Sequence, residues 1–183
     1  MKMDFKRILP ALVLLATATA WGASPSNSFF DKNIKFAWGA DLGASIDMGG
    51  QDMSALDFSA SFGMRRGWIN FLGVGAGASI MVSNSCRSFP LYASFRTNFV
   101  DRPSLLFWDL RLGVSLNYLE HNHQQTGLYG STGLGINLAR SKSFNSHIII
   151  GYTYRERRPI TGAEQSHSFP DLHYASMTIG VVF

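Results

Sequence analysis

The chain ends in a strand-like alternation that runs to its last residue, Phe183. Apolar side chains fall on one face of this segment, and small or polar side chains fall mostly on the other. A β-strand places successive side chains on opposite faces, so the segment predicts a strand between two different environments. One face comprises Ala175, Met177, Ile179, Val181 and Phe183, and the other comprises Tyr174, Ser176, Thr178, Gly180 and Val182.

Seven earlier segments show the same alternation and are separated by stretches rich in turn-forming residues. They cover residues 34–46, 56–65, 71–80, 91–99, 108–118, 128–138 and 147–154, and the last of these is the least regular. With the C-terminal segment they predict an all-β chain. We expect an eight-stranded antiparallel up-and-down β-barrel over residues 34–183.

The position of the charges distinguishes a membrane barrel from a soluble one. Every charge inside these segments falls on the face that is rich in Gly and Ser. A soluble barrel would turn that face toward water, where a glycine in a strand costs conformational entropy and gains no side-chain packing. In a membrane barrel the bulky apolar side chains face lipid and the small ones fill a narrow lumen. The predicted lumen charges are Lys35, Asp41, Asp57, Arg65, Arg96, Asp109 and Arg111.

Unpaired charges in a narrow lumen are costly, so we expect these groups to form ion pairs. Large side chains on the same face add to the filling, namely Phe71, Tyr92, Tyr129 and Tyr174. The glycines of the third and sixth segments would make room for them. The pattern thus favours a plugged lumen, and it leaves open a narrow channel for solutes.

The first twenty residues predict a cleaved signal peptide. Lys2, Lys6 and Arg7 precede an apolar stretch over residues 8–16, and Ala18-Thr19-Ala20 follows as an A-x-A cleavage site. Cleavage after Ala23 is the alternative, and the residues up to 33 would form a periplasmic leader. The apolar stretch is too short to span a bilayer, and the mature chain has no transmembrane-helix pattern.

The composition excludes few other classes of protein. The predicted signal peptide carries two of the four net positive charges, so the mature chain is close to neutral and no nucleic-acid partner is expected. Its length fits one domain. The single cysteine, Cys86, falls in a predicted external loop as a free thiol.

Four stretches of the chain resemble the small bacterial outer-membrane β-barrels of the porin family, of the OmpA and OmpX type. They are Phe89–Phe99, Trp108–Gly113, Gly151–Tyr154 and Ile179–Phe183. The resemblance implies insertion into the outer membrane, contact with its lipids, and recognition of the C-terminal strand by the assembly machinery. Within that strand, Ile179, Val181 and Phe183 would carry the assembly signal.

The loop lengths predict an orientation. With the N-terminus in the periplasm, the connections 47–54, 82–88, 119–126 and 155–170 face outward, and the shorter connections 66–70, 100–104 and 139–145 face the periplasm. Aromatic girdles would lie at both interfaces, with Trp38, Trp68, Phe99, Trp108 and Phe183 on the periplasmic side and Tyr118 and Tyr154 on the outer side.

Three motifs suggest a binding or catalytic site but lack the structural context that such a site requires. Gly73–Ala78 fits a loose dinucleotide fingerprint but continues a strand. Glu120–His123 offers two imidazoles and a carboxylate, yet no third partner is defined, although His167 lies in another loop. His173, with Ser166, Ser168 and Asp171, is the nearest approach to a nucleophilic set.

The sequence therefore predicts no catalytic, cofactor or metal site. It favours a non-enzymatic outer-membrane barrel with a structural or surface-interaction role, whose loop partner it does not identify. A narrow channel and an outer-membrane enzyme that modifies lipid A remain the alternatives.

Overall fold

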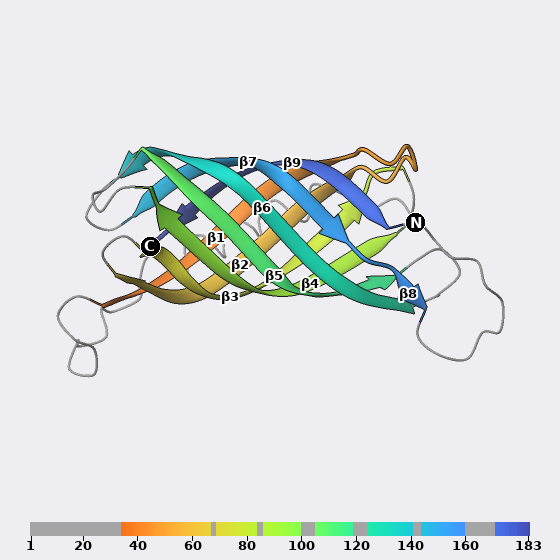
Figure 1. The fold of residues 1–183 in the computed structure, drawn as a ribbon, viewed down its shortest axis with the longest axis horizontal. Coiled ribbons are helices and arrows are strands. Elements are labelled where there is room, and N and C mark those ends of the chain that lie inside the picture. The colour runs from red at the N-terminus through yellow and green to blue at the C-terminus, as the bar shows by residue number, and fades with distance from the viewer. Residues whose placement is uncertain are drawn as a thin grey trace, which may run out of the picture. The chain divides into compact units, whose positions relative to one another are not determined.

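The computed structural model describes residues 34–66, 69–83, 86–99, 105–118, 124–140, 144–159 and 171–183. Eight long strands and one strand of two residues make up this part of the chain (Figure 1). They are β1 (Lys35–Asp47), β2 (Ala55–Arg66), β3 (Ile69–Met81), β4 (Arg87–Asn98), β5 (Leu106–Tyr118), β6 (Gln124–Arg140), β7 (Asn145–Arg155), β8 (Arg158–Pro159) and β9 (Leu172–Val182).

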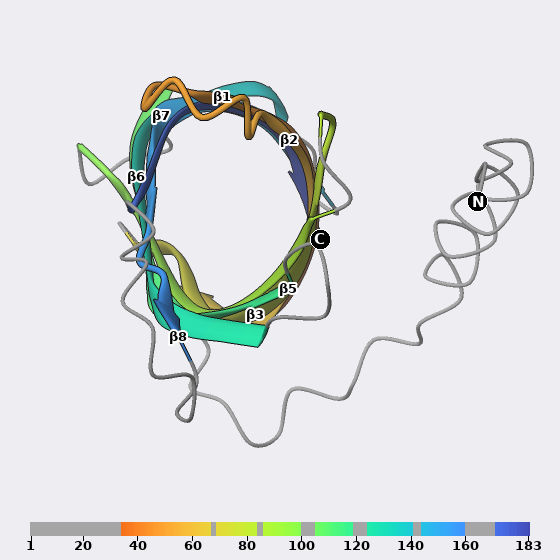
Figure 2. The same cartoon turned by 90° about the vertical axis from the view of Figure 1, so that its right-hand side faces the viewer.

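The eight long strands close into a barrel. Each pairs antiparallel with its neighbours in the chain, β1 pairs with β9, and the pairing of β5 with β6 completes the ring. Figure 2 looks along the barrel and shows this ring of strands. The structure confirms the predicted eight-stranded antiparallel barrel.

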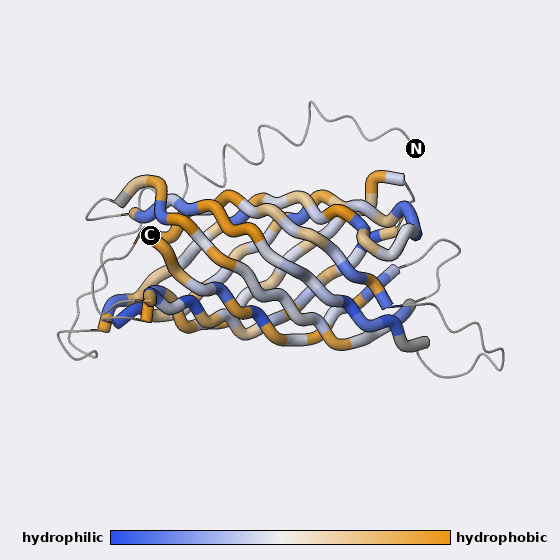
Figure 3. The backbone as a smooth tube through the Cα atoms, turned by 45° about the horizontal axis from the view of Figure 1, so that its top comes forward, coloured by the Kyte–Doolittle hydropathy of each residue, from blue (hydrophilic) through white to orange (hydrophobic). Residues whose placement is uncertain are grey.

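Burial alternates along the strands as the period of two requires. In β1, Asp41, Gly43 and Ser45 are buried, whereas Leu42 and Ile46 are exposed on the outer face. Large apolar side chains are exposed on every long strand, and in Figure 3 hydrophobic (orange) stretches are interspersed with paler and blue ones along the barrel. The barrel is therefore polar inside and apolar outside, which is the arrangement of a transmembrane barrel.

Glycines on the inner face make room for large or charged side chains. The ring of Tyr92 covers Gly75, where an added Cβ would lie 2.6 Å from the ring carbon Cε2. Gly180 lies against the carboxylate of Asp41 in the same way, so a larger residue there would displace a buried charge. The small residues of the inner face thus accommodate side chains that arise from other strands.

Several strands extend further than the sequence predicts. β4 begins at Arg87, β6 begins at Gln124 and β7 continues to Arg155, so the corresponding loops are shorter. The short β8 pairs with the start of β6 and was not predicted.

The two ends of the barrel are named here by their residues. The terminal end holds Lys35 and Val182, at the left of Figure 1, and the loop end holds Asp47 and Leu172. An apolar cluster of buried side chains lies at each end. The cluster at the terminal end is Ala37, Phe71 and Val182, and the cluster at the loop end is Ala55, Met81, Cys86, Leu172 and Tyr174.

Part of the sequence-based prediction falls outside the described residues. This applies to the signal peptide 1–20, to the leader up to residue 33, and to the motif 120–123. It applies equally to Trp68, Ser166, His167 and Ser168.

Candidate functional site

The interior of the barrel contains a ring of four alternating charges. Asp41 on β1 and Asp109 on β5 each bind both Arg96 on β4 and Arg111 on β5. The nitrogen–oxygen distances are 2.8 Å (Arg96–Asp41), 2.6 Å (Arg96–Asp109), 2.9 Å (Arg111–Asp41) and 2.9 Å (Arg111–Asp109). All four side chains are buried, so each charge depends on the two opposite charges of the ring for compensation.

His147 on β7 contacts two members of this ring, Asp41 and Arg96. Its Nε2 lies 3.0 Å from Asp41 Oδ1 and 3.2 Å from Arg96 Nη1, and the side chain is buried. Only one nitrogen of the ring makes both contacts, so the tautomer decides whether it donates to Asp41 or accepts from Arg96. The sequence analysis did not select His147, although it shares the inner face with Ile149.

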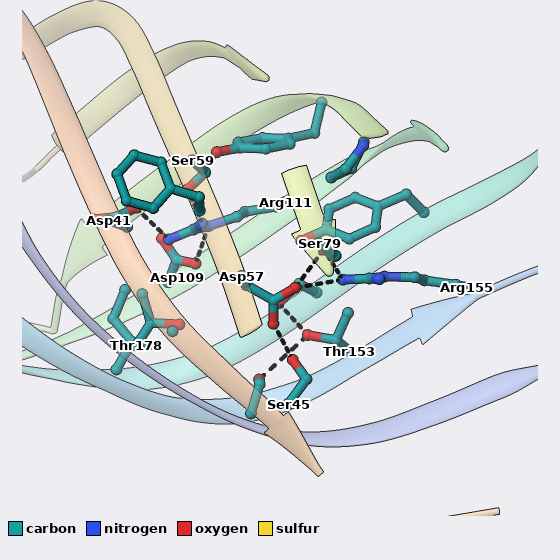
Figure 4. Close-up of a pocket in the computed structure, with 18 residues that line it drawn as sticks. Asp41, Ser45, Asp57, Ser59, Ser79, Asp109, Arg111, Thr153, Arg155 and Thr178 are labelled. Atoms are coloured by element: carbon teal, nitrogen blue, oxygen red, sulfur yellow. Dashed lines mark hydrogen bonds and ion pairs between the residues drawn. The ribbon is translucent and has the colours of Figure 1, made fainter. Parts of the chain in front are cut away.

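A second layer of charge lies closer to the loop end. Arg155 on β7 donates from Nη2 to Asp57 Oδ1 on β2 at 2.9 Å and to Ser79 Oγ on β3 at 2.7 Å. The carboxylate of Asp57 also accepts the hydroxyls of Ser45 and Ser79. Figure 4 shows this layer beside Arg111, Asp41 and Asp109 of the first layer.

Aromatic rings flank the three buried arginines. The guanidinium carbon of Arg96 lies 5.6 Å from the ring centre of Phe71, and that of Arg111 lies 5.5 Å from the ring centre of Tyr92. Arg155 lies between Tyr129 and Tyr174, at 5.8 and 5.1 Å. These rings add cation–π stabilisation to the ion pairs of the three arginines.

Lys35 and Arg65 lie near the terminal end of the barrel. They are paired in the register of β1 and β2, and Lys35 is exposed whereas Arg65 is half-buried. Their membership of the lumen network stays a prediction. The buried ion pairs described above join Asp41, Asp57 and Asp109 to Arg96, Arg111 and Arg155, three acids to three bases.

Arg155 falls at the start of the predicted external connection 155–170, because the predicted strand ends at residue 154. In the structure β7 continues to Arg155, which is buried and shares the inner face with Ile149, Gly151 and Thr153. The alternation of this strand therefore contained a signal for the second layer.

The connection between β1 and β2 folds over the loop end. Asp47 accepts the backbone N–H groups of Gly49, Gln51 and Met53, which holds the turn in place. Arg157 donates to the amide oxygen of Gln51 and approaches the sulfur of Met53 at 3.5 Å. Met53 in turn packs against the apolar cluster of that end.

Cys86 belongs to this cluster. It is a free cysteine, as predicted, but its side chain is 3% exposed and not accessible as a loop residue would be. It packs with Met81 and Leu172, so the predicted external loop contributes part of the barrel's interior.

His173 does not form a nucleophilic set with the residues described. Its side chain lies on the outer face, where Nδ1 makes a hydrogen bond with the hydroxyl of Tyr152. Asp171 accepts the hydroxyl of Tyr154 at 2.7 Å, and this bond holds the pKa of the carboxyl below its ordinary value. These groups resemble an interfacial aromatic girdle more than a catalytic centre.

The described residues contain neither a metal-ion site nor a membrane-spanning helix. No group of three or more His, Cys, Asp or Glu side chains there is placed to hold a metal ion. In the same part of the chain, no helix is both long and apolar enough to cross a bilayer.

Comparison with known proteins gives a likeness of fold. No family model and no curated protein sequence matches the chain. Among solved structures, Neisserial surface protein A aligns over 81% of this chain and 95% of its own, with 17% identity and a TM-score of 0.48. The attachment invasion locus protein of Yersinia pestis aligns over 84% and 100%, with 12% identity and a TM-score of 0.41.

A de novo designed protein, TMB2.3, also aligns, over 84% of this chain and 97% of its own, with 12% identity and a TM-score of 0.43. The strand pairing establishes the class of this chain. It is an all-β protein of eight long antiparallel strands closed into a barrel, with apolar side chains on its outer face.

Proposed function

We propose that this protein is a non-enzymatic outer-membrane β-barrel with a plugged lumen, and that its role is structural or lies in surface interaction through the loops of the loop end. The single observation that carries this proposal is the filled interior. Six charges pair within the lumen, and an apolar cluster lies at each end.

The space left inside is small. The cavity between the two charged layers leaves about 30 Å³ for the centres of water molecules, enough for about two waters. An eight-stranded barrel is just wide enough for side chains to fill, whereas a general pore needs a continuous aqueous channel. The geometry of the interior therefore favours a plug over the narrow channel.

The cellular location rests on three independent features. The leader predicts export to the periplasm, the apolar outer face fits a bilayer, and the C-terminal strand ends on an aromatic residue. The assembly machinery would read Ile179, Val181 and Phe183. Ile179 and Phe183 are exposed on the outer face, where another protein can reach them during insertion.

Conductance of the purified mature protein in planar bilayers tests the plug. We expect no large, steady openings, because the paired side chains fill the lumen. Reproducible openings of porin size from the folded monomer would contradict the proposal and favour the channel. A barrel opened deliberately, for example by replacing Arg111 and Arg155 with Ser, serves as the positive control.

Mass spectrometry of lipid A tests the enzyme alternative. Lipid A from cells with and without the gene should give the same profile if the protein is not an enzyme. A change that depends on the gene and disappears in a His173→Ala variant would overturn that part of the proposal.

A further inference from the structure

Arg155 has more hydrogen-bond donors than the described side chains use. Both contacts of the guanidinium come from Nη2, to Asp57 and Ser79. Its Nε and Nη1 are buried and have no hydrogen-bond partner among the described residues. The side chain is 2% exposed, so bulk solvent does not supply the missing acceptors.

The other two lumen arginines differ in this respect. The Nε of Arg96 donates to Asp109 at 2.6 Å, and the Nε of Arg111 donates to the same carboxylate at 2.9 Å. A buried N–H left without an acceptor costs about 1–3 kcal/mol, and more for a charged group. The flanking rings of Tyr129 and Tyr174 offset part of this cost through cation–π contacts.

Arg155 lines the cavity between the two charged layers (Figure 4). Hydroxyl groups from four strands also line this cavity, namely those of Ser59, Ser131, Thr153 and Ser176. The hydroxyl of Tyr92, which lines it as well, is buried without a partner. The cavity is therefore polar, and its unpaired groups are mainly donors.

Charge and size restrict what can bind there. The network around the cavity is neutral, with three carboxylates against three guanidinium groups, so a free anion would introduce an uncompensated charge. The volume of about 30 Å³ admits one or two atoms of the size of a water oxygen. A neutral molecule that both accepts and donates can bond to the arginine and to the hydroxyls.

We infer that the lumen contains a water-binding site, in which one or two buried waters accept the free N–H groups of Arg155 and bridge them to the hydroxyls that line the cavity. The site joins the Asp57–Arg155 layer to the four-charge ring. The interior of the barrel is thus one continuous hydrogen-bonded structure.

Nuclear magnetic resonance of the three arginine Nε–H groups tests this site in the mature protein, folded in detergent micelles. We expect the Arg155 Nε–H to show a cross-relaxation peak at the frequency of water, with the sign of a long-lived bound molecule. Arg96 and Arg111 are internal controls and should show no such peak, because their Nε–H groups donate to a carboxylate. Absence of the Arg155 peak, or equal peaks on all three, would overturn the inference.

A crystal structure grown with bromide in place of chloride distinguishes water from an anion. We expect water density within hydrogen-bond distance of Arg155 and no anomalous signal there. A bromide peak against the guanidinium would replace the water site with an anion site. A dry cavity would likewise refute the inference while leaving the plugged lumen intact, since the conductance test addresses that separately.

Discussion

Phe183, the last residue of the chain, stacks on Trp38 in the first strand. The ring centres are 4.5 Å apart and the ring planes are 13° from parallel. The backbones of the same two residues exchange hydrogen bonds, at 2.8 Å from Phe183 N to Trp38 O and 3.2 Å in the other direction. The two ends of the barrel sheet are therefore joined by both backbone and side chains at the seam between β1 and β9.

Loss of this stack should weaken the closure of the barrel. We expect Phe183→Ala and Trp38→Ala each to lower the free energy of unfolding, and the double variant to lose less than the sum. The coupling should be about 0.5–1.5 kcal/mol, the usual value for an aromatic pair. Urea unfolding in lipid vesicles measures it, and strictly additive losses would show that the rings do not interact.

Leu112 faces outward in the middle of β5, with 57% of its surface exposed. We expect Leu112→Arg to destabilise the barrel in bilayers by roughly 2–4 kcal/mol, the cost of a cation at the membrane midplane. Leu112→Ala is the matched control and should cost much less, since it places no charge in lipid. If the arginine variant is as stable as wild type, either the inner and outer faces are wrongly assigned or the barrel does not span a bilayer.

Asp109 compensates two buried arginines, whereas Asp57 compensates one and is 24% exposed. Asp109→Ala leaves Arg96 and Arg111 with a single carboxylate between them, so the free energy of unfolding should fall by about 3–5 kcal/mol. Asp57→Ala should cost less, because solvent can partly replace the carboxylate. Chemical unfolding of both variants under the same conditions compares them, and equal losses would argue against the shared role of Asp109.

The strands and their faces could be predicted because a period of two needs only local sequence. Leu42, Asp41 and Gly43 show their faces by alternation alone. The partners across the lumen could not be predicted in the same way. Arg96 reaches Asp41 and Arg155 reaches Asp57 across sequence separations of 55 and 98 residues, and these contacts depend on the stagger of the closed barrel.

Parity alone does not give the depth of a side chain along the barrel. Lys35 and Arg65 have the parity of the inner face and lie at the terminal end, where Lys35 is exposed and Arg65 is half-buried. His147 lies at the first residue of the predicted seventh strand, and Arg155 lies one residue beyond its predicted end. Their parity could be predicted, but the acids that they meet across the lumen could not.

Epitope insertion tests the proposed orientation in the cell. An epitope between Gly162 and Ala163 should be accessible to antibody on intact cells, because that connection is predicted to face outward. An epitope at Ser141 should be accessible only after the outer membrane is permeabilised. Both sites lie outside the described residues, so the experiment tests the topology independently of the structure. Labelling at Ser141 with none at Gly162 would reverse the orientation.

Cys86 reports on the closure of the loop end, because it is the only cysteine of the chain and is buried in the apolar cluster against which Met53 packs. A membrane-impermeant maleimide should label it slowly in the folded protein and rapidly after unfolding. Labelling requires local opening, since the thiolate must reach solvent.

Arg157→Ala should accelerate this labelling. The variant loses the hydrogen bond to Gln51 and the contact with Met53, and a hydrogen bond from a charged group contributes about 1.5–3 kcal/mol. The open population, and with it the labelling rate, should rise by roughly tenfold or more. Arg87→Ala is the control, because Arg87 adjoins Cys86 in sequence but is exposed. Equal rates for the two variants would show that Arg157 does not hold the loop end closed.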